Sequence, residues 1–186
     1  VPDTKELLEG VQTRLYRTID EFTSTSYRGI TGTDLASSWA NRGGTADRID
    51  YAWRTAQAVL GGRSRGDLSI WGLYTSDGKS TIALRNVVCG CRAGLKVGFV
   101  LLEMTDDQIT ARLLAYMTGI EMGRLERDDL TADDRVQIEQ AFAEINNWDL
   151  TIYCDPSMNV GDIRAVQMQQ RYDLIVIDYL QRFDFK

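Results

Sequence analysis

The spacing of apolar positions divides this chain into two regions. Between Thr4 and Phe22, apolar side chains recur every three to four residues, which predicts an amphipathic helix. The stretch from Thr23 to Thr33 is rich in Thr, Ser and Gly and is expected to be a linker. Helical spacing returns from about Ala46 to Leu60, and the glycines at 61 and 62 predict that this second helix ends there.

From Gly66 onward, short apolar runs that fit strands alternate with segments of helical spacing. Because parallel strands need a crossover between them, this alternation predicts an α/β sandwich with a mainly parallel sheet. Thr105 with Gln108, and Thr131, are expected to cap two of the helices. The predicted strands are 68–74, 97–102, 150–154 and 174–177, and the predicted helices are 80–92, 105–116, 131–145 and 160–171.

A Gly-Lys-Ser sequence at Gly78–Ser80 lies between the first of these strands and its helix. There, backbone N–H groups can wrap phosphates, the lysine can neutralise their charge, and the serine hydroxyl can hold Mg²⁺. The usual spacing places a glycine five positions before Gly78, where this chain has Leu73, so a glycine-rich turn with an exposed lysine is the alternative. The candidate nucleotide-binding residues are Thr75, Ser76, Asp77, Gly78, Lys79, Ser80 and Thr81.

Two acidic residues directly follow apolar runs that are predicted to be strands: Glu103 follows 97–102, and Asp178 follows 174–177. Ligands of open parallel sheets bind outside the carboxyl ends of the strands, so both carboxylates are candidates for chemistry. Asp178, with Ser80, is a candidate Mg²⁺ ligand, because Mg²⁺ prefers oxygen ligands. Glu103 is suited to polarise a water molecule that attacks a phosphate.

Composition narrows the possible chemistry. None of the 186 residues is histidine, which excludes Ser-His-Asp and Cys-His catalysis and histidine-ligated zinc. The chain has 21 basic and 27 acidic residues, and a protein that binds nucleic acid through its whole surface should be basic. Any binding of nucleic acid must therefore be restricted to a local region of the surface. Three cysteines argue against a disulfide framework and favour a reducing compartment. The sequence has neither a long apolar run nor a basic leader, so neither membrane insertion nor export is predicted.

The segment from Arg65 to Gln181 resembles the ATPase domain of DnaB-type replicative helicases of bacteria and phages, which has a RecA-like fold. Two of the matching motifs, a Leu-Glu-Met triplet and an Ile-Asp-Tyr-Leu-Gln run, are specific for this family when they occur together, because other RecA-like ATPases seldom have both. The resemblance is carried by Gly66-Asp-Leu, Gly78-Lys-Ser80, Leu102-Glu-Met104, Arg112-Leu-Leu-Ala115, Gly119-Ile120, Ile163-Arg-Ala165 and Ile177-Asp-Tyr-Leu-Gln181.

The resemblance implies an ATP-dependent DNA helicase motor. Lys79 and Ser80 match the nucleotide loop, Glu103 the catalytic glutamate and Asp178 the Mg²⁺-associated aspartate, so that Lys79 and Glu103 serve catalysis. ATP and Mg²⁺ are the implied ligands. The resemblance implies that ATP is hydrolysed at the subunit interfaces of a homo-oligomeric ring, which is a hexamer in the family. This ring would move along single-stranded DNA during replication. A primase or a helicase loader is an implied partner. The implied compartment is the cytoplasm, which would be the cytoplasm of the bacterial host if a phage encodes the chain.

The resemblance also implies a division of the chain. Residues 1–26 are expected to form a linker helix and its connection, with the helix docked on a neighbouring subunit or on its own domain. Residues 27–186 are expected to be a RecA-like domain whose C-terminal part is missing, because in the family a further strand inserts between the two motif-bearing strands. The DNA-contacting loops and the arginine finger would also follow Lys186.

Two other functions stay open at this point. One is a RecA-like DNA-dependent ATPase for recombination or loading, and the other is a nucleotide-binding assembly module with little turnover, which would oligomerise through the helix at 4–22.

Overall fold

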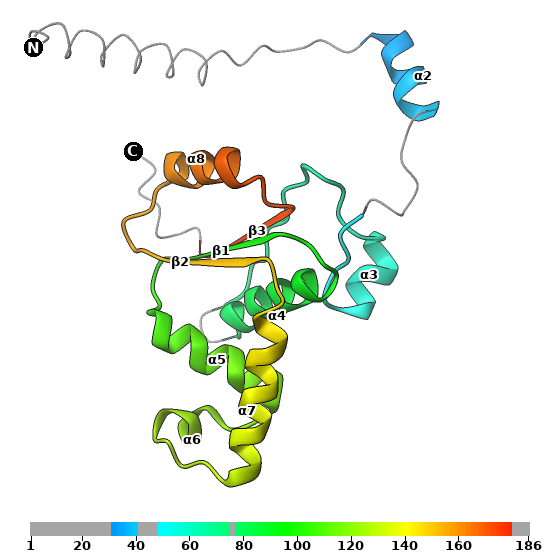
Figure 1. Cartoon of the computed structure of the whole chain (residues 1–186). Helices are drawn as coiled ribbons and strands as arrows, with labels where there is room; N and C mark the ends of the chain where they lie inside the picture. The colour runs from blue at the N-terminus through cyan, green and yellow to red at the C-terminus, as the bar shows by residue number, and fades with distance from the viewer. Residues whose placement is uncertain (1–30, 41–47, 75–76, 180–186) are drawn as a thin grey trace, which may run out of the picture. The chain divides into compact units, whose positions relative to one another are not determined.

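The computed structural model describes residues 31–40, 48–74 and 77–179, and these residues belong to two units (Figure 1). The unit of residues 1–43 contains one described helix, α2 (Gly32–Ala40). Thr31 and Asp34 exchange hydrogen bonds at its start, and both Leu35 and Trp39 are exposed. The sequence did not indicate this helix, which begins within the predicted linker at 23–33. The predicted helix at 4–22 lies outside the described residues.

The unit of residues 44–186 is built on a parallel sheet with the strand order β2-β1-β3. Its central strand, β1 (Val97–Leu101), is completely buried and pairs with β2 (Leu150–Cys154) and β3 (Leu174–Asp178). The three strands lie within the predicted runs or extend them by one residue. The parallel sheet expected from the alternation of strands and helices is therefore confirmed.

Helices cover both faces of this sheet (Figure 1). Thr105 and Thr131 are the N-cap residues of two helices, and both form capping boxes. Thr105 pairs with Gln108, as predicted, and Thr131 pairs with Asp134. A short helix, α6, has no counterpart in the prediction. None of the helices in the described stretches is long and apolar enough to cross a bilayer. The helices after residue 78 are α4 (Lys79–Arg92), α5 (Asp106–Thr118), α6 (Met122–Glu126), α7 (Ala132–Ile145) and α8 (Val160–Gln170).

Alternate residues of β1 face two separate cores. Phe99 and Leu101 pack on the side of α4 and α5, whereas Val100 packs with Ile163 of α8 on the other side. Helix α4 lies directly against the sheet, because a Cβ atom at Gly90 would lie only 3.0 Å from Leu174 Cδ2. This close packing places the C-terminal part of α4 against the start of β3.

The predicted helix at 46–60 is correct only in its second half. Helix α3 (Arg54–Leu60) ends at Gly61, which has the positive φ of 70° expected for a glycine there. Before it, the backbone of Ile49 forms an antiparallel bridge with Arg63. The Gln57 side chain also accepts a hydrogen bond from the backbone N–H of Tyr51. The backbone of Ile49 and Tyr51 thus forms these contacts in place of the helical hydrogen bonds that local spacing predicted.

The predicted strand at 68–74 is wrong. In this described stretch no strand forms, and the side chains of Leu68, Ile70 and Tyr74 are exposed. A strand needs a neighbour for its backbone groups, and the segment is separated from β3 by a cavity.

Candidate functional site

The carboxyl ends of β1 and β3 bring the two predicted acidic residues to one edge of the sheet. Leu101 is in register with Asp178, and the backbone N–H of Leu102 donates to the Asp178 carbonyl at 3.1 Å. Glu103 is therefore only one residue beyond this hydrogen bond. Asp178 is 6% exposed, whereas Glu103 is exposed, so the two carboxylates lie at one edge in different surroundings.

The first turn of α4 lies at the same edge. Gly78 is the residue before the helix and has φ of 84°, a conformation that favours glycine. Lys79 and Ser80 follow as the first helical residues, and N–H groups of a first helical turn have no partner within the helix. Together with the helix dipole, these groups form a binding position for an anion.

The remaining residues of the predicted loop are only partly described. Thr75 and Ser76 lie outside the described residues. Asp77 is exposed, and its backbone N–H donates to the Tyr74 carbonyl at 3.2 Å. Thr81 is also exposed, one residue further into the helix than Ser80.

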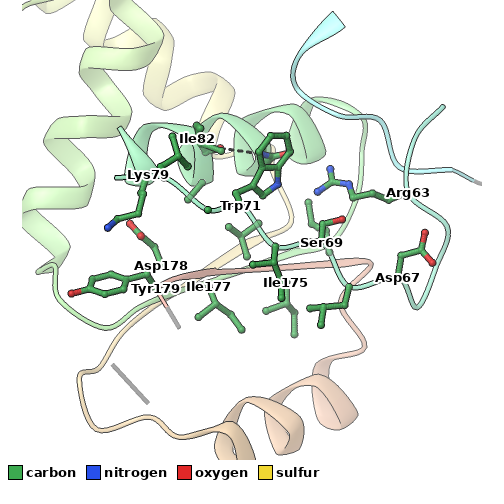
Figure 2. Close-up of a pocket in the computed structure, with 18 residues that line it drawn as sticks. Arg63, Asp67, Ser69, Trp71, Lys79, Ile82, Ile175, Ile177, Asp178 and Tyr179 are labelled. Carbon is green, nitrogen blue, oxygen red and sulfur yellow. Dashed lines mark hydrogen bonds between the residues drawn. The ribbon is translucent and has the colours of Figure 1, made fainter. Parts of the chain in front are cut away.

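A cavity of about 300 Å³ lies between residues 67–73, α4 and β3 (Figure 2). Lys79 and Asp178 lie at one end of it, with Tyr179 beside them, and Arg63 lies at the other end. Ser80 does not line this cavity. The structure thus brings Lys79 and Asp178, which are far apart in the sequence, to the same hollow.

Besides Asp178, two further buried polar side chains line the same cavity. Asn86 is 3% exposed; its amide group donates to the Ile82 carbonyl at 2.9 Å, and its Oδ1 atom has no partner within the described part of the chain. Arg63 donates to the Asp50 carbonyl and lies over the Tyr51 ring, and its Nε atom also has no partner there. Burial lowers the pKa of the Arg63 guanidinium. An acceptor and a donor without partners indicate that the cavity suits a polar occupant.

Tyr179 connects Lys79 with Glu103. Its hydroxyl donates a hydrogen bond of 2.7 Å to Glu103 Oε1, and the Lys79 ammonium lies 5.1 Å from the centroid of its ring. Tyr179 belongs to the Ile177–Gln181 run, but the sequence indicated no role for it. Its position directly after Asp178, at a strand end, was the signal that could have indicated one.

A second hollow of about 230 Å³ also borders the start of α4. It is lined by Ser80 and Thr81 and, from α5, by Arg112 and Tyr116. The Nε atom of Arg112 is buried and, among the described residues, has no hydrogen-bond partner. The first two residues of α4 thus line different hollows, Lys79 the first and Ser80 the second.

The sequence is similar to that of known replication proteins. A family model described as the DnaB-like helicase C terminal domain matches residues 49–186. The replicative DNA helicase DnaB of Geobacillus stearothermophilus is 30% identical over 148 residues, which are 76% of this chain and 32% of that protein. A probable plasmid replicative DNA helicase of Chlamydia trachomatis serovar L2 is 30% identical over 123 residues, 63% of this chain and 27% of its own length. The chain thus spans about a third or less of these relatives.

Solved structures share the fold. A structure titled as a DnaB-like replicative helicase and its interactions with primase matches with a TM-score of 0.76 and 18% identity, over 97% of this chain and 46% of the other. A second structure, titled as an ATPase domain, matches with a TM-score of 0.68 and 20% identity, over 82% of this chain and 56% of the other. These likenesses confirm the predicted α/β fold with its parallel sheet.

Proposed function

Because this chain belongs to the family of DnaB-like helicase C-terminal domains, we propose that it is the ATP-hydrolysing motor of a replicative DNA helicase. The observation that carries the proposal is the meeting of Lys79 and Asp178 at one end of a cavity, beside the first turn of α4. A cation, a helix N-terminus and a strand-end carboxylate are the groups that phosphoryl transfer requires.

In this proposal the phosphates of ATP bind at the start of α4. The N–H groups of the first turn donate to phosphate oxygens, and Lys79 neutralises the charge of the β- and γ-phosphates. The loop residues Thr75, Ser76, Asp77 and Thr81 complete the predicted cradle around Gly78 and Ser80. The positive φ of Gly78 supports this role, because it turns the chain directly into the helix.

Ser80 and Asp178 are the proposed ligands of Mg²⁺. A hydroxyl and a carboxylate are hard oxygen donors, which fit this ion better than they fit a soft metal. Among the residues that the structure describes, no three Asp, Glu, Cys or His side chains converge on one point. When bound between Ser80 and Asp178, Mg²⁺ would supply charge neutralisation at the phosphates, with phosphate and water oxygens as the expected further ligands.

Glu103 is the proposed residue that activates the attacking water. Its carboxylate is exposed at the end of β1 and accepts a hydrogen bond from Tyr179. It polarises the water by accepting a hydrogen bond from it, while Lys79 stabilises charge on the leaving side. Both steps are positioning and electrostatics, and neither needs a histidine.

The partners that we propose follow from the helicase function. The motor acts in a homo-oligomeric ring, a hexamer as in the family, that hydrolyses ATP between subunits and moves along single-stranded DNA in the cytoplasm. A primase or a helicase loader is a proposed partner of the ring. The division into a linker helix with its connection at 1–26 and a RecA-like domain at 27–186 stays a prediction.

The test is made with the whole protein in three assays: binding of fluorescent ATP, ATP hydrolysis with and without single-stranded DNA, and unwinding of a forked duplex. We expect hydrolysis that DNA stimulates, and unwinding that depends on it. Glu103→Gln should still bind nucleotide but hydrolyse it at least about 100-fold more slowly. Asp178→Asn should bind ATP with an affinity that responds less to removal of Mg²⁺ by EDTA.

The other functions give different results in the same assays. A recombination or loading ATPase would hydrolyse ATP in response to DNA but form joint molecules or load a partner instead of unwinding a fork. An assembly module would bind ATP with little turnover, with or without DNA. Near wild-type hydrolysis by Glu103→Gln would contradict the role given to Glu103.

A further inference from the structure

Tyr179 lies between two residues to which the proposed function gives separate tasks. Its hydroxyl donates to Glu103 Oε1 at 2.7 Å, and its ring lies under the Lys79 ammonium at 5.1 Å from the centroid. Figure 2 shows Tyr179 next to Asp178 and Lys79 at one end of the cavity. One half-buried side chain therefore contacts both the group that would bind phosphate and the group that would activate water.

The two contacts differ in chemistry. A hydrogen bond from a hydroxyl to a carboxylate is charge-assisted and directional, so it restrains the position of Glu103 Oε1. An ammonium over an aromatic face is attracted to it but can slide across it, because this attraction depends weakly on direction. The contact with Glu103 therefore orients that residue, whereas the contact with Lys79 leaves the ammonium able to move onto a phosphate.

The backbone explains why Tyr179 can reach Glu103. Strand β3 ends at Asp178, which is in register with Leu101, the last residue of β1, so that Tyr179 and Glu103 follow the strand ends at the same edge of the sheet, one and two residues beyond them. The hydrogen bond between Leu102 N–H and the Asp178 carbonyl holds the two chain ends together directly before Glu103 and Tyr179. The pair is thus set by the sheet rather than by a flexible loop.

We propose that Tyr179 is a positioning residue for ATP hydrolysis, which orients the Glu103 carboxylate through its hydroxyl while its ring supports Lys79 before nucleotide binds. This inference rests on the proposed function, since it concerns the same site. The positioning role predicts that the Tyr179 hydroxyl affects the rate of ATP hydrolysis and that the Tyr179 ring affects the position of Lys79.

The experiment compares Tyr179→Phe with Tyr153→Phe in the whole protein. Tyr153 is a matched control, because it is a tyrosine of β2 whose hydroxyl also bonds to another side chain, that of Tyr172, at 2.8 Å. Tyr179→Phe should lower kcat for ATP hydrolysis about tenfold or more, the effect of one lost hydrogen bond to a charged group, and change KM less than about twofold. Tyr153→Phe should leave both constants unchanged.

A double-mutant cycle with Glu103→Asp tests the contact itself. Aspartate keeps the charge but is one methylene shorter, so its carboxylate does not meet the tyrosine hydroxyl. In this background Tyr179→Phe should cause no further loss of kcat. An equal loss in both backgrounds, or an unchanged kcat in the single variant, would overturn the positioning role.

The two proposals fail in different ways. If Glu103→Gln abolishes turnover while Tyr179→Phe hydrolyses ATP like the wild type, the proposed function stands and the inference about Tyr179 is wrong. If Glu103→Gln keeps turnover, the catalytic role of Glu103 is wrong, and Tyr179 has no role through it.

Discussion

Lys79, the first residue of α4, and Asp178, the last residue of β3, line the same end of one cavity. Neither residue is near the other in the sequence. They meet because α4 packs on the sheet next to β3, with Gly90 allowing the close approach to Leu174. The candidate site is therefore a product of how a helix and a strand pack, not of one contiguous motif.

We expect Lys79→Ala to weaken the binding of Mg²⁺·ATP by about tenfold to 100-fold, because it removes a charge-assisted contact to phosphate. The measurement is titration with a fluorescent ATP analogue. Lys96→Ala is the matched control, since Lys96 also lies over a tyrosine ring, that of Tyr172, but lines neither hollow. Equal losses of affinity in the two variants would contradict a specific role for Lys79.

A side chain at position 98 should destabilise the sheet. A Cβ atom added at Gly98 of β1 would lie 3.0 Å from ring atoms of Tyr172, whose hydroxyl is bonded to Tyr153. Gly98→Ala should therefore lower the free energy of unfolding by about 1–3 kcal/mol, measured by urea denaturation. Gly72→Ala is the control, because nothing lies within 4 Å of a Cβ atom there, and it should change stability little.

The capping box of α7 should make stability depend on pH. Hydrogen bonds from the Thr131 side chain and backbone lower the pKa of the Asp134 carboxyl, and Arg124 lowers it further. Because this pKa is lower in the folded state, the ionised carboxylate stabilises the fold above the ordinary Asp pKa of about 4. This stabilisation is lost as pH falls through the lowered pKa.

Asp134→Asn should therefore be less stable than the wild type at pH 7, with a difference that shrinks as pH falls below about 4. Urea midpoints measured across this range would show the change. Asp133→Asn is the control, since Asp133 lies in the same first turn but is exposed. A difference between Asp134→Asn and the wild type that stays constant with pH would contradict the role of the ionised carboxylate.

Cys91 should resist alkylation in the folded protein. Burial raises the pKa of its thiol to about 12, and the thiolate is the reactive form. Iodoacetamide at pH 8 should leave Cys91 unmodified until urea unfolds the chain, as peptide mass spectrometry would show. Rapid modification without urea would mean that the core between α4 and β1 opens readily.

Much of the fold was predictable because its signals are local. Helical hydrogen bonds join residues four apart, so the spacing of apolar residues and the caps at Thr105 and Thr131 located α5 and α7. The continuous apolar run of β1 indicated a strand buried on both faces. Because a Gly-Lys-Ser sequence before a run of helical spacing is also a local signal, the sequence could place Gly78 and Lys79 at a helix start.

The sequence by itself thus determined the helices after residue 78 other than α6, the three parallel strands, and the placing of Glu103 and Asp178 at strand ends. Tertiary structure decided the rest, because a strand needs a partner that local sequence does not supply. It left 68–74 outside the sheet, and it replaced the first half of the predicted helix at 46–60 with the bridge between Ile49 and Arg63. It alone brought the Tyr179 hydroxyl to Glu103, since that contact depends on the register of β1 and β3.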